Sequence, residues 1–244
     1  HISFTPLLLI VLTQSTSAHE QFMFKSLETK DGLSHSQINS IFKDSRGFMW
    51  FSTAGGLNRY DGYEFKVYQH EEQNPYSLTD NYVDDIQEDA DGNLWVHSPP
   101  TYLLYDVHKE IFIRDIASIL AKYGIEGTVN LLHIDKKKNI WFCMSDDGGI
   151  YQYHLESKDL HYYPQDDKDG FSTGTITHVC EDDASILFVF NTGLIESIDR
   201  KSGKIDVRYN YIPEHSNMIS EKYSLFVDSE NNYWVYSKDN SGLW

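Results

Sequence analysis

The chain has 244 residues, 40% of them apolar, which suits one large globular domain or two small ones. Acidic residues outnumber lysine and arginine by 37 to 20, and the resulting formal charge of −17 argues against nucleic-acid binding, because an acidic surface repels phosphates. The sequence has no run of 18 apolar residues and only two cysteines, which argues against a transmembrane helix within it and against a disulfide scaffold.

The first predicted element is the remnant of a signal peptide at residues 1–18. A short apolar run at 6–12 is followed by small and polar residues, with Thr16 and Ala18 where a cleavage site needs small side chains. The alternative is a buried N-terminal strand. The signal-peptide interpretation predicts an exported protein whose mature chain begins near His19.

A repeat of about 46 residues organises the rest of the chain. In each copy an aspartate lies six residues before a large aromatic residue, which we call the anchor. The aspartates are Asp44, Asp89, Asp135, Asp182 and Asp228. The anchors are Trp50, Trp95, Trp141, Phe188 and Trp234, at spacings of 45, 46, 47 and 46 residues. Five copies in phase are unlikely to arise by chance.

Each copy contains four short apolar runs, which is typical of one blade of a β-propeller. The anchor lies on the predicted second strand. The predicted third and fourth strands are 57–60 and 65–68, 103–105 and 111–113, 150–153 and 160–163, and 194–198 and 205–209. We therefore expect an all-β fold at 19–244, with about five four-stranded blades in an open ring. Residues 22–27 resemble a stray outer strand.

Two local features lie between the strands. Residues 115–124 have apolar side chains at helical spacing and end in glycine, which predicts a short helix between the second and third blades. Cys143 and Cys180 lie on strands of neighbouring blades, and nothing in the repeat requires them to pair. We expect them to stay free.

The first copy has a distinctive pattern: Asp31-Gly-Leu-Ser34, then Asp44-Ser-Arg-Gly-Phe-Met-Trp50-Phe-Ser-Thr53, then Gly56-Leu-Asn-Arg-Tyr60-Asp-Gly62. It resembles the two-component regulator propeller repeat, and more narrowly the periplasmic sensor region of hybrid two-component histidine kinases. The resemblance covers about 22–244. The departures from it are Thr101 in place of glycine, Phe188 in place of tryptophan and His154 in place of aspartate.

The resemblance implies a seven-bladed ring, followed in the intact protein by a membrane helix, a histidine kinase, a receiver and a DNA-binding module. It also implies that the protein senses an oligosaccharide and controls polysaccharide-utilisation genes. From the same resemblance we expect a homodimer in the intact receptor, with membrane contact only through a C-terminal region beyond this sequence.

Catalytic and metal sites are not favoured by the residue patterns. Asp89-Ala-Asp91-Gly-Asn93 has oxygen-bearing side chains at alternate positions, as a calcium loop does, but its glycine is fourth rather than sixth. The equivalent residues of the other copies also fit a tight turn, which accounts for the pattern without a metal. No nucleophile elbow, phosphate loop or zinc motif is present in the sequence. We expect no cofactor, no metal and no catalytic residue. The alternatives are a secreted propeller lyase or hydrolase acting on polysaccharide, or a sensor attached to a diguanylate cyclase.

The candidate binding residues lie on one face of the predicted ring. Turns within blades are short on one face, whereas the long connections 69–80, 114–128, 164–175 and 210–221 all reach the other face. Binding is commonly built from such long loops on a rigid scaffold. The candidates on this face, which we call the long-loop face, are Tyr76, His97, Tyr102, Asp146 and Asp147. Aromatic rings there would stack on sugars, and carboxylates would accept hydrogen bonds from hydroxyls.

Overall fold

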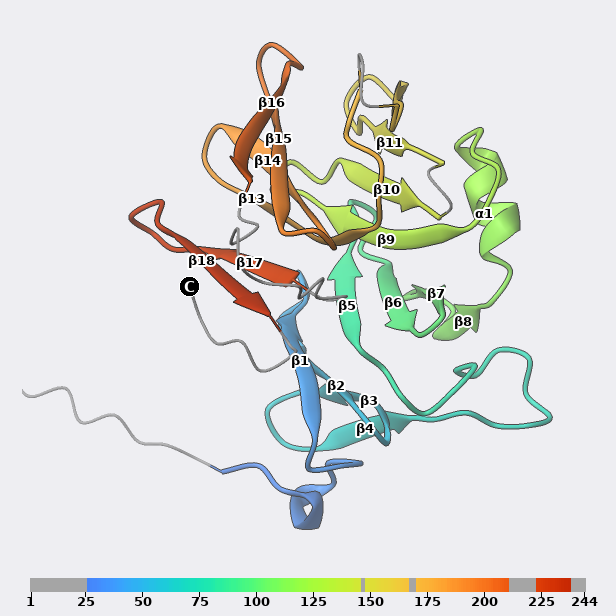
Figure 1. The fold of residues 1–244 in the computed structure, drawn as a ribbon. Helices are drawn as coiled ribbons and strands as arrows, with labels where there is room; N and C mark the ends of the chain where they lie inside the picture. Colours follow the sequence, from blue (N-terminus) through green and yellow to red (C-terminus); the bar gives the residue numbers. More distant parts are fainter. Residues whose placement is uncertain (1–25, 146–147, 167–169, 211–222, 238–244) are drawn as a thin grey trace, which may run out of the picture.

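The computed structural model describes residues 26–145, 148–166, 170–210 and 223–237. These residues form four four-stranded sheets and one two-stranded sheet, and in every sheet consecutive strands pair antiparallel. The sheets are arranged as blades around their first strands (Figure 1). The β-propeller class is therefore confirmed, with four complete blades and two described strands of a fifth. The predicted signal peptide at 1–18 lies outside the described residues.

The strand bounds follow the repeat. Blade 1 consists of β1 (Ile38–Lys43), β2 (Met49–Thr53), β3 (Gly56–Tyr60) and β4 (Phe65–Tyr68). Blade 2 consists of β5 (Asp85–Glu88), β6 (Leu94–Ser98), β7 (Thr101–Asp106) and β8 (Ile111–Ile113). Blade 3 consists of β9 (Val129–Ile134), β10 (Ile140–Met144), β11 (Ile150–Tyr153) and β12 (Leu160–Tyr163). Blade 4 consists of β13 (Ile176–Glu181), β14 (Ser185–Phe190), β15 (Leu194–Asp199) and β16 (Ile205–Asn210), and blade 5 of β17 (Tyr223–Val227) and β18 (Tyr233–Ser237).

The third and fourth strands lie within two residues of their predicted bounds in all four complete blades. The predicted helix is also confirmed, as α1 (Ile116–Lys122), and Asp115 caps it by accepting a hydrogen bond from the Ser118 backbone amide. The proposed outer strand at 22–27 lies mostly outside the described residues; its last two residues are not in a strand, and a short 3-10 helix, η1 (Thr29–Asp31), follows.

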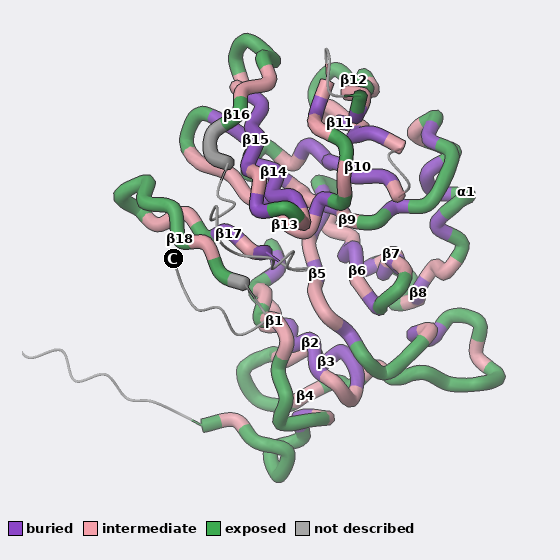
Figure 2. The backbone as a smooth tube through the Cα atoms, in the orientation of Figure 1, coloured by how far each residue is buried: buried purple, intermediate pink, exposed green. Residues whose placement is uncertain are grey.

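Blades pack face to face, so the second strands are apolar on both sides. In β6 of blade 2, Trp95 packs against blade 3, whereas Leu94 and Val96 pack against blade 1. One apolar cluster lies at each of the four blade interfaces. Burial is accordingly concentrated on the strands of the blades, while most connecting turns are exposed (Figure 2). This explains why the anchor strands lack polar alternation.

The repeated aspartate closes a tight turn and also holds the anchor. In blade 1, Oδ1 of Asp44 accepts hydrogen bonds from the backbone amides of Arg46 and Phe48, while Oδ2 accepts one from the Trp50 indole. Asp135 and Asp228 hold Trp141 and Trp234 in the same way. Blade 2 differs, because the buried Nε1 of Trp95 has no hydrogen-bond partner.

The predicted anchor of blade 4 is wrong by one residue. In the other blades the anchor pairs with the residue two before the aspartate, but in blade 4 that residue, Cys180, pairs with Leu187. The cause is a shorter turn: the Asp182 amide bonds the Ser185 carbonyl, one residue earlier than in the other blades. A one-residue shift reverses the side-chain direction along the strand. Phe188 therefore faces blade 3, where its ring lies edge-on to Trp141.

The predicted burial of the anchors is confirmed in blades 1, 2 and 3 and fails in blade 5. Trp50, Trp95 and Trp141 are almost fully buried, whereas 43% of Trp234 is exposed. Each buried anchor is covered by the next blade along the ring. The described part of the chain supplies no following blade to cover Trp234, which accounts for its exposure.

Side chains on the first strands bridge neighbouring blades. The amide nitrogens of Asn39 and Asn130 donate to the backbone carbonyls of Val83 and Ile176, at 2.7 and 2.9 Å. Gln87 pairs with the backbone of β9 through both its amide nitrogen and its amide oxygen. These bonds fix the first strands side by side around a central space, which is where the candidate site lies. Cys143 and Cys180 are both free, as expected.

Candidate functional site

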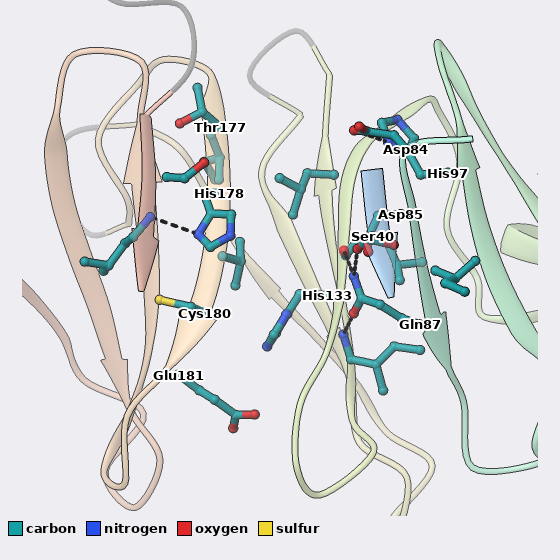
Figure 3. Close-up of a pocket in the computed structure, with 18 of the residues that line it drawn as sticks. Ser40, Asp84, Asp85, Gln87, His97, His133, Thr177, His178, Cys180 and Glu181 are labelled. Atoms are coloured by element: carbon teal, nitrogen blue, oxygen red, sulfur yellow. Dashed lines mark hydrogen bonds and ion pairs between the residues drawn. The ribbon is translucent and has the colours of Figure 1, made fainter. Parts of the chain in front are cut away.

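A cavity of about 1370 Å³ lies between the first strands of the blades. All five of these strands, β1, β5, β9, β13 and β17, contribute lining residues, and Figure 3 shows ten of these residues labelled. Two of the predicted binding residues, His97 and Tyr102, line it as well. The cavity therefore connects the long-loop face with the centre of the ring.

His97 and Tyr102 form one side of the cavity at the long-loop face. Their rings stack with centroids 4.6 Å apart, and Nδ1 of His97 lies 3.4 Å from Oδ2 of Asp84. The Tyr102 hydroxyl accepts a hydrogen bond of 3.0 Å from the Leu132 amide, and only 7% of this residue is exposed. Burial raises the pKa of the Tyr102 phenol. Tyr102 thus supports the His97 ring from behind, and His97 is the more accessible of the two.

The other predicted residues are not brought to this point. Tyr76 lies in the connection between β4 and β5. It is 58% exposed and is not among the residues that line the cavity. Arg114 orders that connection by donating to the backbone carbonyls of Asn74, Ser77 and Leu78. Asp146 and Asp147 lie outside the described residues.

A pair of adjacent carboxylates lies on β5 and just before it. Asp84 reaches His97 at the long-loop face, and Asp85 lies deeper, where its Oδ2 is 3.4 Å from the Gln87 side-chain nitrogen and its carboxylate interacts with Ser40 (Figure 3). Burial raises the pKa of Asp85, against the opposing effect of those hydrogen bonds. The carboxylates offer hydrogen-bond acceptors to anything that enters the cavity.

His133 and Gln87 hold the same register in neighbouring blades, since each pairs with its blade's anchor. Gln87 donates to the Leu132 carbonyl at 3.0 Å and accepts from the Ile134 amide at 2.6 Å. The His133 side chain extends between β9 and β13, and its buried Nε2 has no hydrogen-bond partner. Burial lowers the pKa of His133 to about 4, so the imidazole is neutral at neutral pH.

The opposite end of the cavity carries both charges, because the carboxylates of Glu88, Asp135 and Glu181 line it together with Lys136 and Lys138. Arg200, from the turn after β15, lies 3.3 Å from Oδ2 of Asp135 and also pairs with Glu181. Within the described part of the chain, the only lysines that line this cavity are Lys136 and Lys138, in the turn between β9 and β10. Among the described lining residues, lysines therefore lie only at the short-turn end of the cavity, away from His97.

The sequence motif considered for calcium forms an ordinary turn. Oδ1 of Asp89 accepts hydrogen bonds from the backbone amides of Asp91 and Asn93. Within the described ranges, no group of three or more His, Cys, Asp or Glu residues is placed to hold a metal ion. In the same residues, no helix is both long and apolar enough to span a membrane.

Sequence reasoning missed the residues of the inner wall, above all Asp84, Asp85 and His133. Their signal was present, because polar residues interrupt these first strands, at Asp85 and Gln87 of β5 and at Asn130 and His133 of β9. The pattern does not reveal which edge of a blade faces the centre. Five separate strands must be placed before these side chains converge.

Comparison with known families supports the repeat assignment. Residues 32–55 and 77–99 match the family described as two component regulator propeller. These segments contain the first two strands of blades 1 and 2, so the match falls on the two blades where the repeat pattern is clearest. A curated relative, histidine kinase P4 of Formosa agariphila, is 38% identical over 61 residues, which is 25% of this chain and 4% of that protein.

Solved structures share the fold. The extracellular domains of two hybrid two component systems from B. thetaiotaomicron superpose with TM-scores of 0.51 and 0.52 at 17% identity. The matches cover 90% and 84% of this chain but only 34% and 33% of those domains, so the chain spans about a third of each. Virginiamycin B lyase from Staphylococcus aureus gives 0.52 at 16% identity, over 83% of this chain and 64% of the lyase. Because a lyase and these extracellular domains share it, the fold alone does not separate binding from catalysis.

Proposed function

We propose that this chain is the ligand-sensing propeller of an exported hybrid two-component histidine kinase, acting on the periplasmic side of the inner membrane. The observation that carries the proposal is the match of blades 1 and 2 to the two component regulator propeller family. The partial match to a histidine kinase and the fold shared with extracellular domains of hybrid two component systems agree with it.

The ligand in this proposal is an oligosaccharide that binds at the long-loop face and enters the cavity beside His97. Hydroxyl groups of a sugar would donate to carboxylate oxygens such as those of Asp84, and the His97 ring offers a flat surface for stacking. Tyr76, exposed in the connection from β4 to β5, belongs to the same predicted face but does not line the cavity. The chain binds and signals, and catalysis belongs to a kinase domain elsewhere in the protein.

Signal transfer in this proposal depends on two receptor copies. Ligand binding would change how the propellers of a homodimer pack, and the change would pass through the membrane to the kinase, which controls polysaccharide-utilisation genes. A ligand can shift such an equilibrium only by its difference in affinity for the two arrangements.

The test is ligand titration by calorimetry on the full-length protein, with autophosphorylation measured in parallel. Neutral tetrasaccharides of glucose, xylose, mannose and galactose serve as probes. We expect His97→Ala to weaken binding about tenfold or more, which corresponds to about 1.4 kcal/mol. Lys109→Ala, in the turn between β7 and β8 on the opposite face, is the control and should leave the affinity unchanged. Loss of binding in the control with none in His97→Ala would contradict the assigned face.

A further inference from the structure

The cavity beside His97 is acidic at the end that a ligand would enter. Asp84 and Asp85 both line it there, and its lining lysines lie at the other end. Lys138 there is already engaged, since its ammonium lies 3.4 Å from Oε2 of Glu88 and donates to the Glu88 carbonyl. The only potentially cationic lining group beside the two carboxylates, within the described residues, is His97, and it faces Asp84.

Neutral polar groups line the cavity between the acidic entrance and the charged short-turn end. The hydroxyls of Thr177 and Ser40 lie at about the depth of Asp84 and Asp85, and the amide of Gln87 and the imidazole of His133 lie deeper. His133 supplies an observation independent of the carboxylates, because its buried Nε2 is left without a hydrogen-bond partner while the equivalent Gln87 is fully engaged. A buried polar atom without a partner costs free energy, which a small movement of the ring toward a bound hydroxyl would recover.

We propose that this cavity selects uncharged, hydroxyl-rich oligosaccharides and rejects those that carry carboxylate or sulfate groups; the inference rests on the proposed function. Carboxylate oxygens only accept hydrogen bonds, so Asp84 and Asp85 require a ligand that donates them. Hydroxyls donate, whereas a uronate or sulfate group brings further acceptors and a like charge. Repulsion between like charges is strongest where the surroundings are partly shielded from water, as they are at Asp85.

The test compares three matched sets of probes on the full-length protein by calorimetry at low salt: neutral tetrasaccharides, tetragalacturonate and a sulfated galactose tetrasaccharide. We expect the best neutral probe to bind at least tenfold more tightly than either anionic probe. Raising the salt concentration should narrow this difference, because screening weakens repulsion.

Substitutions test whether these two carboxylates cause the selectivity. Asp84→Asn and Asp85→Asn keep the side-chain shape and remove the charge, and each should improve the affinity of the anionic probes relative to the neutral one by about fivefold to tenfold. Asp61→Asn, in the exposed turn between β3 and β4, removes one charge outside the cavity and should not change the ratio. Circular dichroism of each variant checks that it is folded.

The outcomes separate the inference from the proposed function. If an anionic probe binds as tightly as the neutral ones, or if the ratio is the same in wild type and both cavity variants, the selectivity inference is overturned while oligosaccharide sensing stands. If no probe of any class binds, oligosaccharide sensing fails and the selectivity inference fails with it.

Discussion

The indole nitrogen of Trp50 donates a 2.9 Å hydrogen bond to Oδ2 of Asp44, six residues earlier in the chain. Asp44 is buried, and its other oxygen accepts from two backbone amides of the turn. One carboxylate therefore fixes the turn that starts β2 and the orientation of the ring that fills the blade interface. The repeat couples local turn chemistry to the core through a single residue.

Removing the Asp44 carboxylate should destabilise the protein substantially. Asp44→Ala leaves the Trp50 indole and two backbone amides without their acceptor, and we expect a loss of about 3 kcal/mol in the free energy of unfolding. Urea denaturation followed by circular dichroism measures it. Asp228→Ala removes the same set of bonds at the exposed Trp234 and is the matched control, with a clearly smaller effect expected. Equal losses at both positions would contradict the role of burial.

The anchors of blades 1 and 2 should respond differently to the same substitution. Trp50→Phe removes a buried hydrogen bond as well as part of a ring, whereas Trp95→Phe removes only part of a ring, because Nε1 of Trp95 has no partner. We expect Trp50→Phe to cost about 1 kcal/mol more in unfolding free energy. Thermal and urea unfolding of the two variants check this. A greater loss for Trp95→Phe would show that Nε1 of Trp95 has a hydrogen-bond partner in solution.

Acid should lower the free energy of unfolding through the titration of His133. Burial lowers its pKa from 6.5 to about 4 in the folded state, while Asp135, His178 and Arg200 act on it electrostatically. As pH falls below 6.5, the unfolded chain takes up the proton first, so the contribution of the neutral ring to stability is present above pH 6.5 and is lost progressively toward pH 4.

The comparison that isolates this effect uses His133→Gln, which cannot titrate and matches the residue at the equivalent position of blade 2. Between pH 8 and pH 5 we expect wild type to lose about 2 kcal/mol more unfolding free energy than the variant, from the pKa difference alone. Urea titrations at several pH values measure both curves. Parallel curves would show that the folded-state pKa of His133 is not lowered.

Arg200 should be essential to the short-turn end of the cavity. Its guanidinium lies between the carboxylates of Asp135 and Glu181, and only 13% of its side chain is exposed. Arg200→Met leaves both carboxylates without their cation, for which we expect a loss of about 3 kcal/mol. Lys204→Met breaks the exposed pair with Asp206 and should change stability by less than about 0.5 kcal/mol. Urea unfolding of the two variants measures both losses of unfolding free energy. Similar small losses would contradict the predicted importance of the buried ion pairs of Arg200.

The spacing of the repeat was enough to predict the blades, because strand period, turn aspartates and apolar anchors are all local in sequence. It failed at Phe188, since counting six residues from Asp182 assumes a constant turn length. Blade 4 has a turn shorter by one residue, and this puts Leu187 at the anchor register. Turn length depends on backbone hydrogen bonds that residue types alone do not specify here.

The candidate site was predicted only at its rim. His97 lies near the end of β6, beside the turn to β7, so its place on the long-loop face could be predicted from the repeat. Asp85 and His133 come from different blades and meet only after the ring forms. The hydrogen bond from the indole to the turn aspartate was also missed, because the six-residue interval was interpreted as turn chemistry alone.

The fixed interval between turn aspartate and anchor has a consequence for how the chain can accept insertions. A residue added between Asp44 and Trp50 would move the indole out of reach of its acceptor and reverse the facing of β2. The stretch between β8 and β9, by contrast, already accommodates α1, and the anchors Trp95 and Trp141 keep the same pairing on either side of it. Length variation, whether from evolution or from a genetically inserted fluorescent reporter, is therefore tolerated on the side of the ring where ligand contacts would be acquired.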